Sequence, residues 1–91
     1  MAPEQSTIEI LNRLIGFASV SSESNLDIVS WIENYLSQHG ITSRRIPDRT
    51  GRKASILATI GPSERAGVVL SAHTDVVPVA GQDWTSPPFT A

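Results

Sequence analysis

The expected fold depends on the stretch Val68-Val69-Leu70-Ser71-Ala72-His73-Thr74-Asp75-Val76-Val77-Pro78, in which a largely apolar run, residues 68–72, is followed by a histidine. Residues 68–72 are largely apolar on both faces of an extended chain, which is typical of a strand inside a sheet that helices cover on both sides. His73 follows at the carboxyl end of that strand, and open α/β sheets bind their ligands beyond such ends. The run therefore predicts an α/β fold with His73 and Asp75 at the ligand-binding edge of its sheet.

Two helices are predicted before this run. Ser6-Thr7-Ile8-Glu9 is a capping-box pattern, and the apolar residues behind it recur at helical spacing, which predicts a helix over residues 6–19. Ser24 is suited to cap a second helix, and Gly40 is suited to end it in the left-handed conformation. The aromatic residues of this second helix fall on its apolar face, so we expect them to pack in a core.

Two further strands are predicted between the second helix and the apolar run, at residues 41–46 and 54–60, with a turn at 47–51. Two helices followed by about three strands indicate a layered α/β architecture. Both helices precede the strands, so one face of the sheet would lack cover if the protein ended at Ala91. We therefore expect residues 1–91 to be the N-terminal piece of a longer protein.

Composition narrows the class of protein. The chain has 91 residues, of which 40% are hydrophobic and 18% charged, and its net charge is −2, as in an ordinary soluble globular chain. Five basic residues between positions 44 and 53 share that stretch with Asp48, which favours a solvated strand-loop-strand edge over a nucleic-acid surface. The absence of cysteine excludes disulfides and cysteine-rich zinc sites. No apolar stretch approaches the ~20 residues that span a bilayer, and the N-terminus is not a secretory signal, so we expect a cytoplasmic protein.

Few residues can carry chemistry. His73 is a candidate metal ligand because a neutral imidazole at a strand end suits zinc. Asp75 would either bind metal itself or accept a hydrogen bond from the ring of the ligating histidine and so fix its tautomer. From the residue pattern alone, a purely structural histidine remains the alternative for His73. His39 at the end of the second helix is expected to be structural, whereas Trp84 would either line a site or cover the domain.

The sequence around this pair resembles the co-catalytic dizinc peptidase and deacylase family. The block from Leu70 to Val79, followed by Trp84 and by Pro88-Phe89, is similar to the first signature of that family. Upstream, residues 14–21 are similar to the family's opening, and Ser24-Asn25-Leu26 most resembles its acetylornithine deacetylase members. The resemblance covers nearly the whole chain.

This resemblance implies a layered α/β/α zinc-peptidase-like catalytic domain, with residues 1–91 as its N-terminal, metal-binding part and a smaller lid or dimerisation domain elsewhere. His73 matches the first zinc ligand of the family, and Asp75 matches the acidic catalytic residue held beside that ligand. The implied reaction is hydrolysis of N-acetyl-L-ornithine to L-ornithine and acetate, a step of arginine biosynthesis, by a hydroxide that bridges two Zn²⁺ ions. Co²⁺ or Mn²⁺ would be able to replace zinc.

The resemblance leaves alternatives open. A desuccinylase, an aminoacylase or a dipeptidase of the same family would share these residues, and a non-catalytic α/β binding module would share the fold without the site. The expected partners of the full-length protein are a small N-acylated amino acid and a second copy in a homodimer, with no nucleic acid and no membrane. Zinc needs three or four protein ligands, so we expect residues 1–91 alone to be inactive. The sequence assigns no substrate-binding residue and no acyl specificity.

Overall fold

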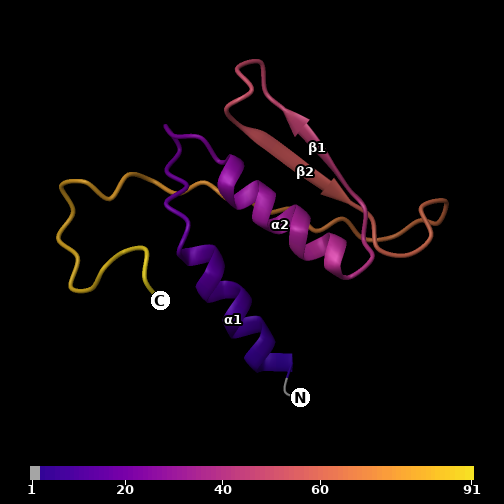
Figure 1. Ribbon diagram of the computed structural model, residues 1–91, viewed down its shortest axis with the longest axis horizontal. Coiled ribbons are helices and arrows are strands. Elements are labelled where there is room, and N and C mark those ends of the chain that lie inside the picture. The colour runs from indigo at the N-terminus through magenta and orange to yellow at the C-terminus, as the bar shows by residue number, and fades with distance from the viewer. Residues whose placement is uncertain (1–2) are drawn as a thin grey trace.

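The computed structural model describes residues 3–91, and their side chains from Ser6 onward. It contains two helices, α1 (Pro3–Ile15) and α2 (Leu26–Gln38), and two strands, β1 (Ser43–Pro47) and β2 (Ala54–Ala58). The strands form a two-stranded antiparallel sheet, and α2 packs along it (Figure 1). The expected mixture of helix and strand is confirmed, but within residues 3–91 the sheet is antiparallel and two-stranded.

The first helix differs from its prediction at both ends. It begins at Pro3, so Ser6 lies inside its first turns and not at the cap, and proline suits the first helical position because its missing N–H needs no partner there. It ends at Ile15 and not at residue 19, because Gly16 closes the last turn with its N–H on the Asn12 and Arg13 carbonyls, 3.2 Å from each. Figure 1 shows α1 pointing away from the sheet. The apolar stripe expected to face a core is therefore half exposed, as at Leu11 (52%).

The second helix confirms its prediction, and its C-terminus has a Schellman geometry. Gly40 takes a left-handed φ of 72°. Its N–H donates to the Ser37 carbonyl over 3.0 Å, and the next N–H, from Ile41, reaches the Leu36 carbonyl over 2.9 Å. These two bonds satisfy carbonyls that the helix leaves without partners, and glycine adopts this conformation without steric cost.

The start of α2 connects the helix to the sheet. The residue before the helix is Asn25 and not the predicted Ser24, although the Ser24 hydroxyl still accepts the Leu26 N–H over 3.2 Å. The Asn25 side chain instead pairs with the backbone of Ala54, its Nδ2 donating to the carbonyl and its Oδ1 accepting the N–H, both at 2.9 Å. Asn25 thus takes the place of a neighbouring strand for the first residue of β2.

The core lies between α2 and the sheet, and it is small. Its buried apolar residues in the described chain are Ile28, Val29 and Ala54, with Val29 only 1% exposed. Arg45 on β1 adds a polar connection to α2, because its guanidinium donates twice to the Glu33 carboxylate, at 2.6 and 3.1 Å. This bidentate pair raises the pKa of Arg45 above its usual value.

The aromatic residues of α2 pack at its surface. Trp31 stacks on Tyr35, with ring centroids 5.6 Å apart, and Phe17 approaches Trp31 at 6.4 Å. Tyr35 in turn contacts His39 at 4.7 Å. Trp31 and Tyr35 thus pack against other rings, but they stay partly accessible and do not join the buried core that the sequence predicts for them.

The hairpin is held by its turn. The Asp48 carboxylate accepts the backbone N–H of Thr50 (3.1 Å) and of Gly51 (2.9 Å), and Gly51 takes a φ of 74°. The Thr50 hydroxyl also donates to it over 2.8 Å. These bonds lower the pKa of Asp48, chiefly through Thr50. The turn is thus confirmed around Asp48 and Gly51, but Pro47, predicted to lie in it, is the last residue of β1 and pairs with Ala54. At the open end of the hairpin both strands are shorter than predicted: β1 begins at Ser43 and not at residue 41, and β2 ends at Ala58 and not at residue 60.

The prediction of a strand at residues 68–72 is wrong, because the structure of residues 3–91 has no strand there. Val68, Val69 and Leu70 are 88%, 85% and 92% exposed, and His73 therefore does not end a buried strand. An extended segment becomes a strand only when a neighbouring backbone pairs with it, and here the segment runs clear of both strands of the sheet. The radius of gyration, 15.2 Å, reflects this openness, since a compact chain of this length has about 12 Å.

No helix within residues 3–91 is long and apolar enough to cross a membrane.

Candidate functional site

His73 and Asp75 contact each other directly, as the sequence pattern predicts. The Nδ1 atom of His73 lies 2.9 Å from the Asp75 Oδ1 atom and 3.0 Å from the Asp75 backbone carbonyl. Both of these neighbours are acceptors, so Nδ1 carries the ring proton and Nε2 keeps its lone pair. The His73 side chain is 84% exposed, which leaves Nε2 open to a ligand.

The connection between α1 and α2 holds the backbone of this pair in place. Val20 and Val76 form a parallel bridge, in which the Val76 N–H donates to the Ser19 carbonyl over 3.0 Å and the Ser21 N–H donates to the Val76 carbonyl over 2.9 Å. Ser19 is 5% exposed, and its hydroxyl donates to the Thr74 carbonyl over 2.6 Å. Residues 74–76 are therefore fixed by polar contacts with a segment more than fifty positions earlier.

Ser21 adds a contact to the carboxylate itself. Its hydroxyl lies 2.8 Å from Asp75 Oδ2, so each carboxylate oxygen has a different partner, Ser21 on one side and His73 on the other. The Lys53 ammonium donates to the Ser21 carbonyl and ties this segment to the start of β2. The Ser21 hydrogen bond, followed by that of His73, lowers the pKa of Asp75, while desolvation opposes the shift.

Sequence reasoning missed the supporting residues Ser19, Ser21 and Lys53. The polar run from Ser21 to Asn25 indicates only a break between helices, and nothing local connects it with residues 54 positions later. The one available signal is the resemblance of residues 14–21 to the N-terminal sequence of family members, and this resemblance does not indicate which residues contact Asp75.

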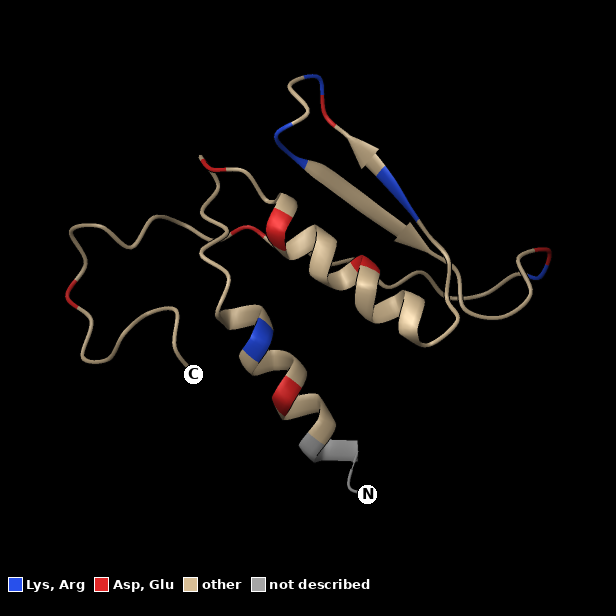
Figure 2. Ribbon diagram, in the orientation of Figure 1, with Lys and Arg blue, Asp and Glu red and all other residues tan. Residues whose placement is uncertain are grey.

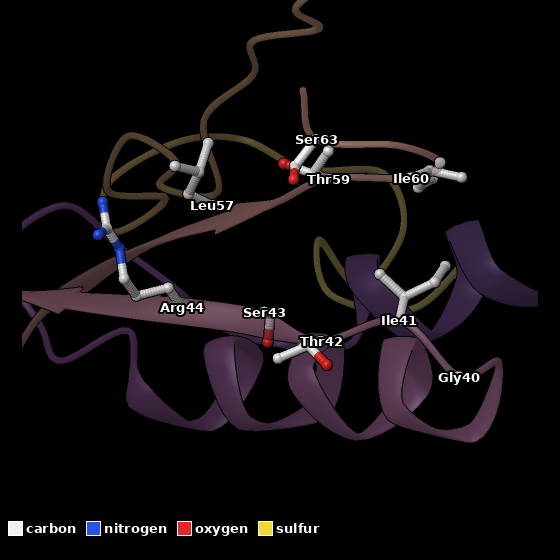
Figure 3. A pocket seen from close by; sticks show the side chains of 10 residues that line it. Gly40, Ile41, Thr42, Ser43, Arg44, Leu57, Thr59, Ile60 and Ser63 are labelled. Atoms are coloured by element: carbon white, nitrogen blue, oxygen red, sulfur yellow. The ribbon is translucent and has the colours of Figure 1, made fainter. Parts of the chain in front are cut away.

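Two hollows lie on this part of the chain. One of about 790 Å³ runs between the sheet, the buried side of α2 and residues 70–75, with His73 and Asp75 on its wall. The other, of about 480 Å³, lies between the end of α2, the start of β1 and the end of β2, and it contains neither His73 nor Asp75 (Figure 3). The hollow of about 790 Å³ is thus the one lined by the two candidate functional residues, His73 and Asp75.

The remaining candidates do not join the site. Trp84 is 51% exposed, its indole N–H donates to Gln82 over 3.0 Å, and it lines neither hollow. His39 caps the end of α2 against Tyr35, as expected for a structural residue. Basic residues lie along β1 and around its turn, with acidic residues in the same turn and on α2, so charges of both signs alternate there (Figure 2).

The donor set fits one position of a metal site. The His73 side chain is exposed, and its ring is oriented by a carboxylate on the Nδ1 side, as is usual for zinc-ligating histidines. Within residues 3–91, however, no group of three or more His, Cys, Asp or Glu residues is arranged to hold an ion. Residues 3–91 therefore present one oriented imidazole and no complete metal site.

The curated proteins to which this chain is similar include the acetylornithine deacetylases of three bacteria. The acetylornithine deacetylase of Proteus mirabilis (strain HI4320) is 35% identical over 91 residues, which cover 91% of this chain and 23% of that protein. The enzymes of the same name from Photorhabdus laumondii and Shigella sonnei are each 33% identical, with the same coverage. The resemblance predicted from the sequence is confirmed, and the chain spans about a quarter of the length of these curated relatives. No family model and no solved structure matches the chain significantly.

Proposed function

We propose that this chain is the N-terminal, metal-binding part of a zinc-dependent amide hydrolase that removes the acetyl group from N-acetyl-L-ornithine. The observation that carries the proposal is the His73–Asp75 pair, in which Nε2 is left free inside a stretch similar to acetylornithine deacetylases. In this proposal His73 is a metal ligand, and Asp75 is the catalytic carboxylate that orients it.

The chemistry divides between the metal and the protein. A bound pair of zinc ions would lower the pKa of a shared water and polarise the amide carbonyl. The task of Asp75 is to accept a hydrogen bond from the His73 Nδ1–H group, so that the neutral ring presents the Nε2 lone pair to the metal. The hollow of about 790 Å³ beside the pair offers room for a small N-acylated amino acid.

The proposal extends to the complete protein. The relatives are about four times longer than this chain. A complete protein of that length would contain the remaining metal ligands, the rest of a layered α/β/α domain and a second domain that forms a homodimer. A cytoplasmic place in arginine biosynthesis follows from the same proposal.

The test is metal-dependent hydrolysis by the complete protein. We expect the zinc-loaded protein to release acetate from N-acetyl-L-ornithine, and we expect a chelator to abolish the reaction and added zinc to restore it. N-succinyl-diaminopimelate and N-acyl amino acids with longer acyl chains serve as competing substrates. Preference for one of these would move the assignment to another deacylase of the family.

One observation favours a second candidate, a non-catalytic α/β module. Residues 3–91 offer a single oriented imidazole and no cluster of three ligands. We therefore expect the 91-residue chain by itself to bind zinc weakly and to hydrolyse nothing. Calorimetric titration of this chain that gives tight, stoichiometric zinc binding would contradict the partial-site assignment.

A further inference from the structure

The contact between Ser21 and Asp75 assigns a role to a residue outside the His73–Asp75 pair. We infer that Ser21 is a positioning residue, whose hydroxyl holds the Asp75 carboxylate in the orientation that keeps the His73 ring proton on Nδ1 and Nε2 free for a ligand. The inference rests on the proposed function, and it deepens it by placing part of the site on the α1–α2 connection.

The Ser21 hydroxyl is placed by the backbone around it. Its own N–H is bound to the Val76 carbonyl at 2.9 Å, and its carbonyl accepts the Lys53 ammonium. The neighbouring Val20 forms the bridge with Val76. With both backbone groups engaged, the Ser21 Cβ atom is held beside Asp75, within reach of its carboxylate.

The carboxylate has one partner on each oxygen. Oδ2 lies 2.8 Å from the Ser21 hydroxyl, and Oδ1 lies 2.9 Å from His73 Nδ1. The Val76 carbonyl, 3.0 Å from the same hydroxyl, already accepts the Ser21 N–H, so the charged Oδ2 is the stronger acceptor for the hydroxyl proton. Without Ser21, the exposed carboxylate is free to rotate about its Cβ–Cγ bond, and the Asp75 backbone carbonyl, 3.0 Å away, is then the one acceptor that still favours a proton on Nδ1.

Other side chains do not duplicate this function. The Ser19 hydroxyl is bound to the Thr74 carbonyl at 2.6 Å, so it fixes backbone and not the carboxylate. Ser22, the next residue, is exposed. Ser22→Ala is therefore a matched control for Ser21→Ala, with the same atoms removed one position away.

The first measurement uses the complete protein without metal. With ¹⁵N-labelled histidine, and at a pH well above the ordinary imidazole pKa of about 6.5, NMR reports which ring nitrogen of His73 is protonated. We expect a proton on Nδ1 in the wild type and in Ser22→Ala, and a mixture of both tautomers in Ser21→Ala. Ser21→Thr keeps the hydroxyl on the same carbon and should restore the Nδ1 form.

The second measurement is zinc affinity of the same proteins. Removal of a group that orients a ligand costs 10- to 100-fold in metal affinity, so we expect about 10-fold weaker zinc binding in Ser21→Ala and recovery in Ser21→Thr. If Ser21 acts through Asp75, Ser21→Ala should add nothing in an Asp75→Ala background, whereas a general loss of structure would add to it.

The outcomes separate this inference from the proposed function. A Ser21→Ala protein with the tautomer and zinc affinity of Ser22→Ala overturns the role of Ser21, as do additive effects with Asp75→Ala. A complete wild-type protein that binds no zinc overturns the proposed function, and the metal-free tautomer comparison then decides the role of Ser21 by itself.

Discussion

Residues 19–58 and residues 59–91 make opposite use of their apolar side chains. In the first region Ile28, Val29 and Ala54 are buried between α2 and the hairpin. In the second region Val68, Val69 and Leu70 are almost fully exposed, yet this region carries His73 and Asp75. The comparison teaches that His73 and Asp75 are held in place by a few hydrogen bonds to the first region, and not by a hydrophobic core of their own.

The largest effect is expected from substitution of His73, the candidate metal ligand in the second region. In the complete protein, His73→Ala should reduce zinc binding and deacetylation by more than about 100-fold, because loss of a ligand exceeds the cost of losing a group that orients one. Isothermal titration with zinc and an acetate-release assay measure both quantities. His39→Ala is the matched control, since this exposed histidine contacts Tyr35 at the end of α2. Normal turnover by His73→Ala would show that His73 is not needed for the reaction and that the second region does not carry the functional histidine.

The next effect is a difference in amide hydrogen exchange within the 91-residue chain. Amides of α2 and of the paired strands should exchange more slowly than free peptide, whereas those of residues 66–72 should exchange close to the free-peptide rate, because no strand of residues 3–91 pairs with them. Mass spectrometry of peptides from the two regions measures this directly. Equal protection in both regions would show that residues 66–72 have found a partner.

A smaller effect is expected inside the packed region. Asn25→Ala removes both hydrogen bonds to Ala54, each 2.9 Å long, and at about 1 kcal/mol per bond it should lower the free energy of unfolding by about 2 kcal/mol. Urea unfolding followed by far-UV circular dichroism measures the change. Asn34→Ala, on the exposed side of α2, is the control and should change it by less than about 0.5 kcal/mol. Equal effects would mean that Asn25 does not connect helix and sheet.

The smallest effect is a pH dependence at the hairpin turn. The pKa of Asp48 is lowered from its usual value of 3.8, chiefly by the Thr50 hydroxyl, so the folded turn favours the charged carboxylate. Its contribution to stability is complete above the ordinary pKa and is lost as the pH falls through the lowered folded value. NMR titration of the Thr50 and Gly51 amides should follow this loss. Asp48→Asn keeps an acceptor oxygen without a titrating group, so its turn amides should not titrate there.

The packed region was the more predictable of the two, because its signals are local. Gly40 marks the end of α2 wherever that helix packs, and Asp48 and Gly51 make the turn with their own neighbours. The start of α1 was misjudged because Pro3 suits a first helical turn as well as Ser6 suits a cap.

The second region was less predictable because its signals depend on distant partners. The apolar run at residues 68–72 has the composition of a buried strand, but composition does not supply a paired backbone, and neither strand of residues 3–91 pairs with it. The pairing of His73 with Asp75 was predictable because the two residues are only two positions apart in the sequence. Ser19 and Ser21 were missed because their contacts join positions 54 and 55 apart.

The bridge between Val20 and Val76 has a consequence for how the site opens and closes. The contact of Ser21 with Val76 joins residues 55 positions apart, but α2 and the hairpin between them are already folded. The flexible stretch that this contact closes is residues 59–75, and closing a loop of about 17 residues costs about 2.5 kcal/mol in chain entropy. A ligand that binds only the closed arrangement, at 100 times its dissociation constant, contributes about 2.7 kcal/mol in the other direction. The two quantities are of similar size. We therefore expect the bridge to behave as a latch, so that occupancy of His73 and closure of the chain form one cooperative event.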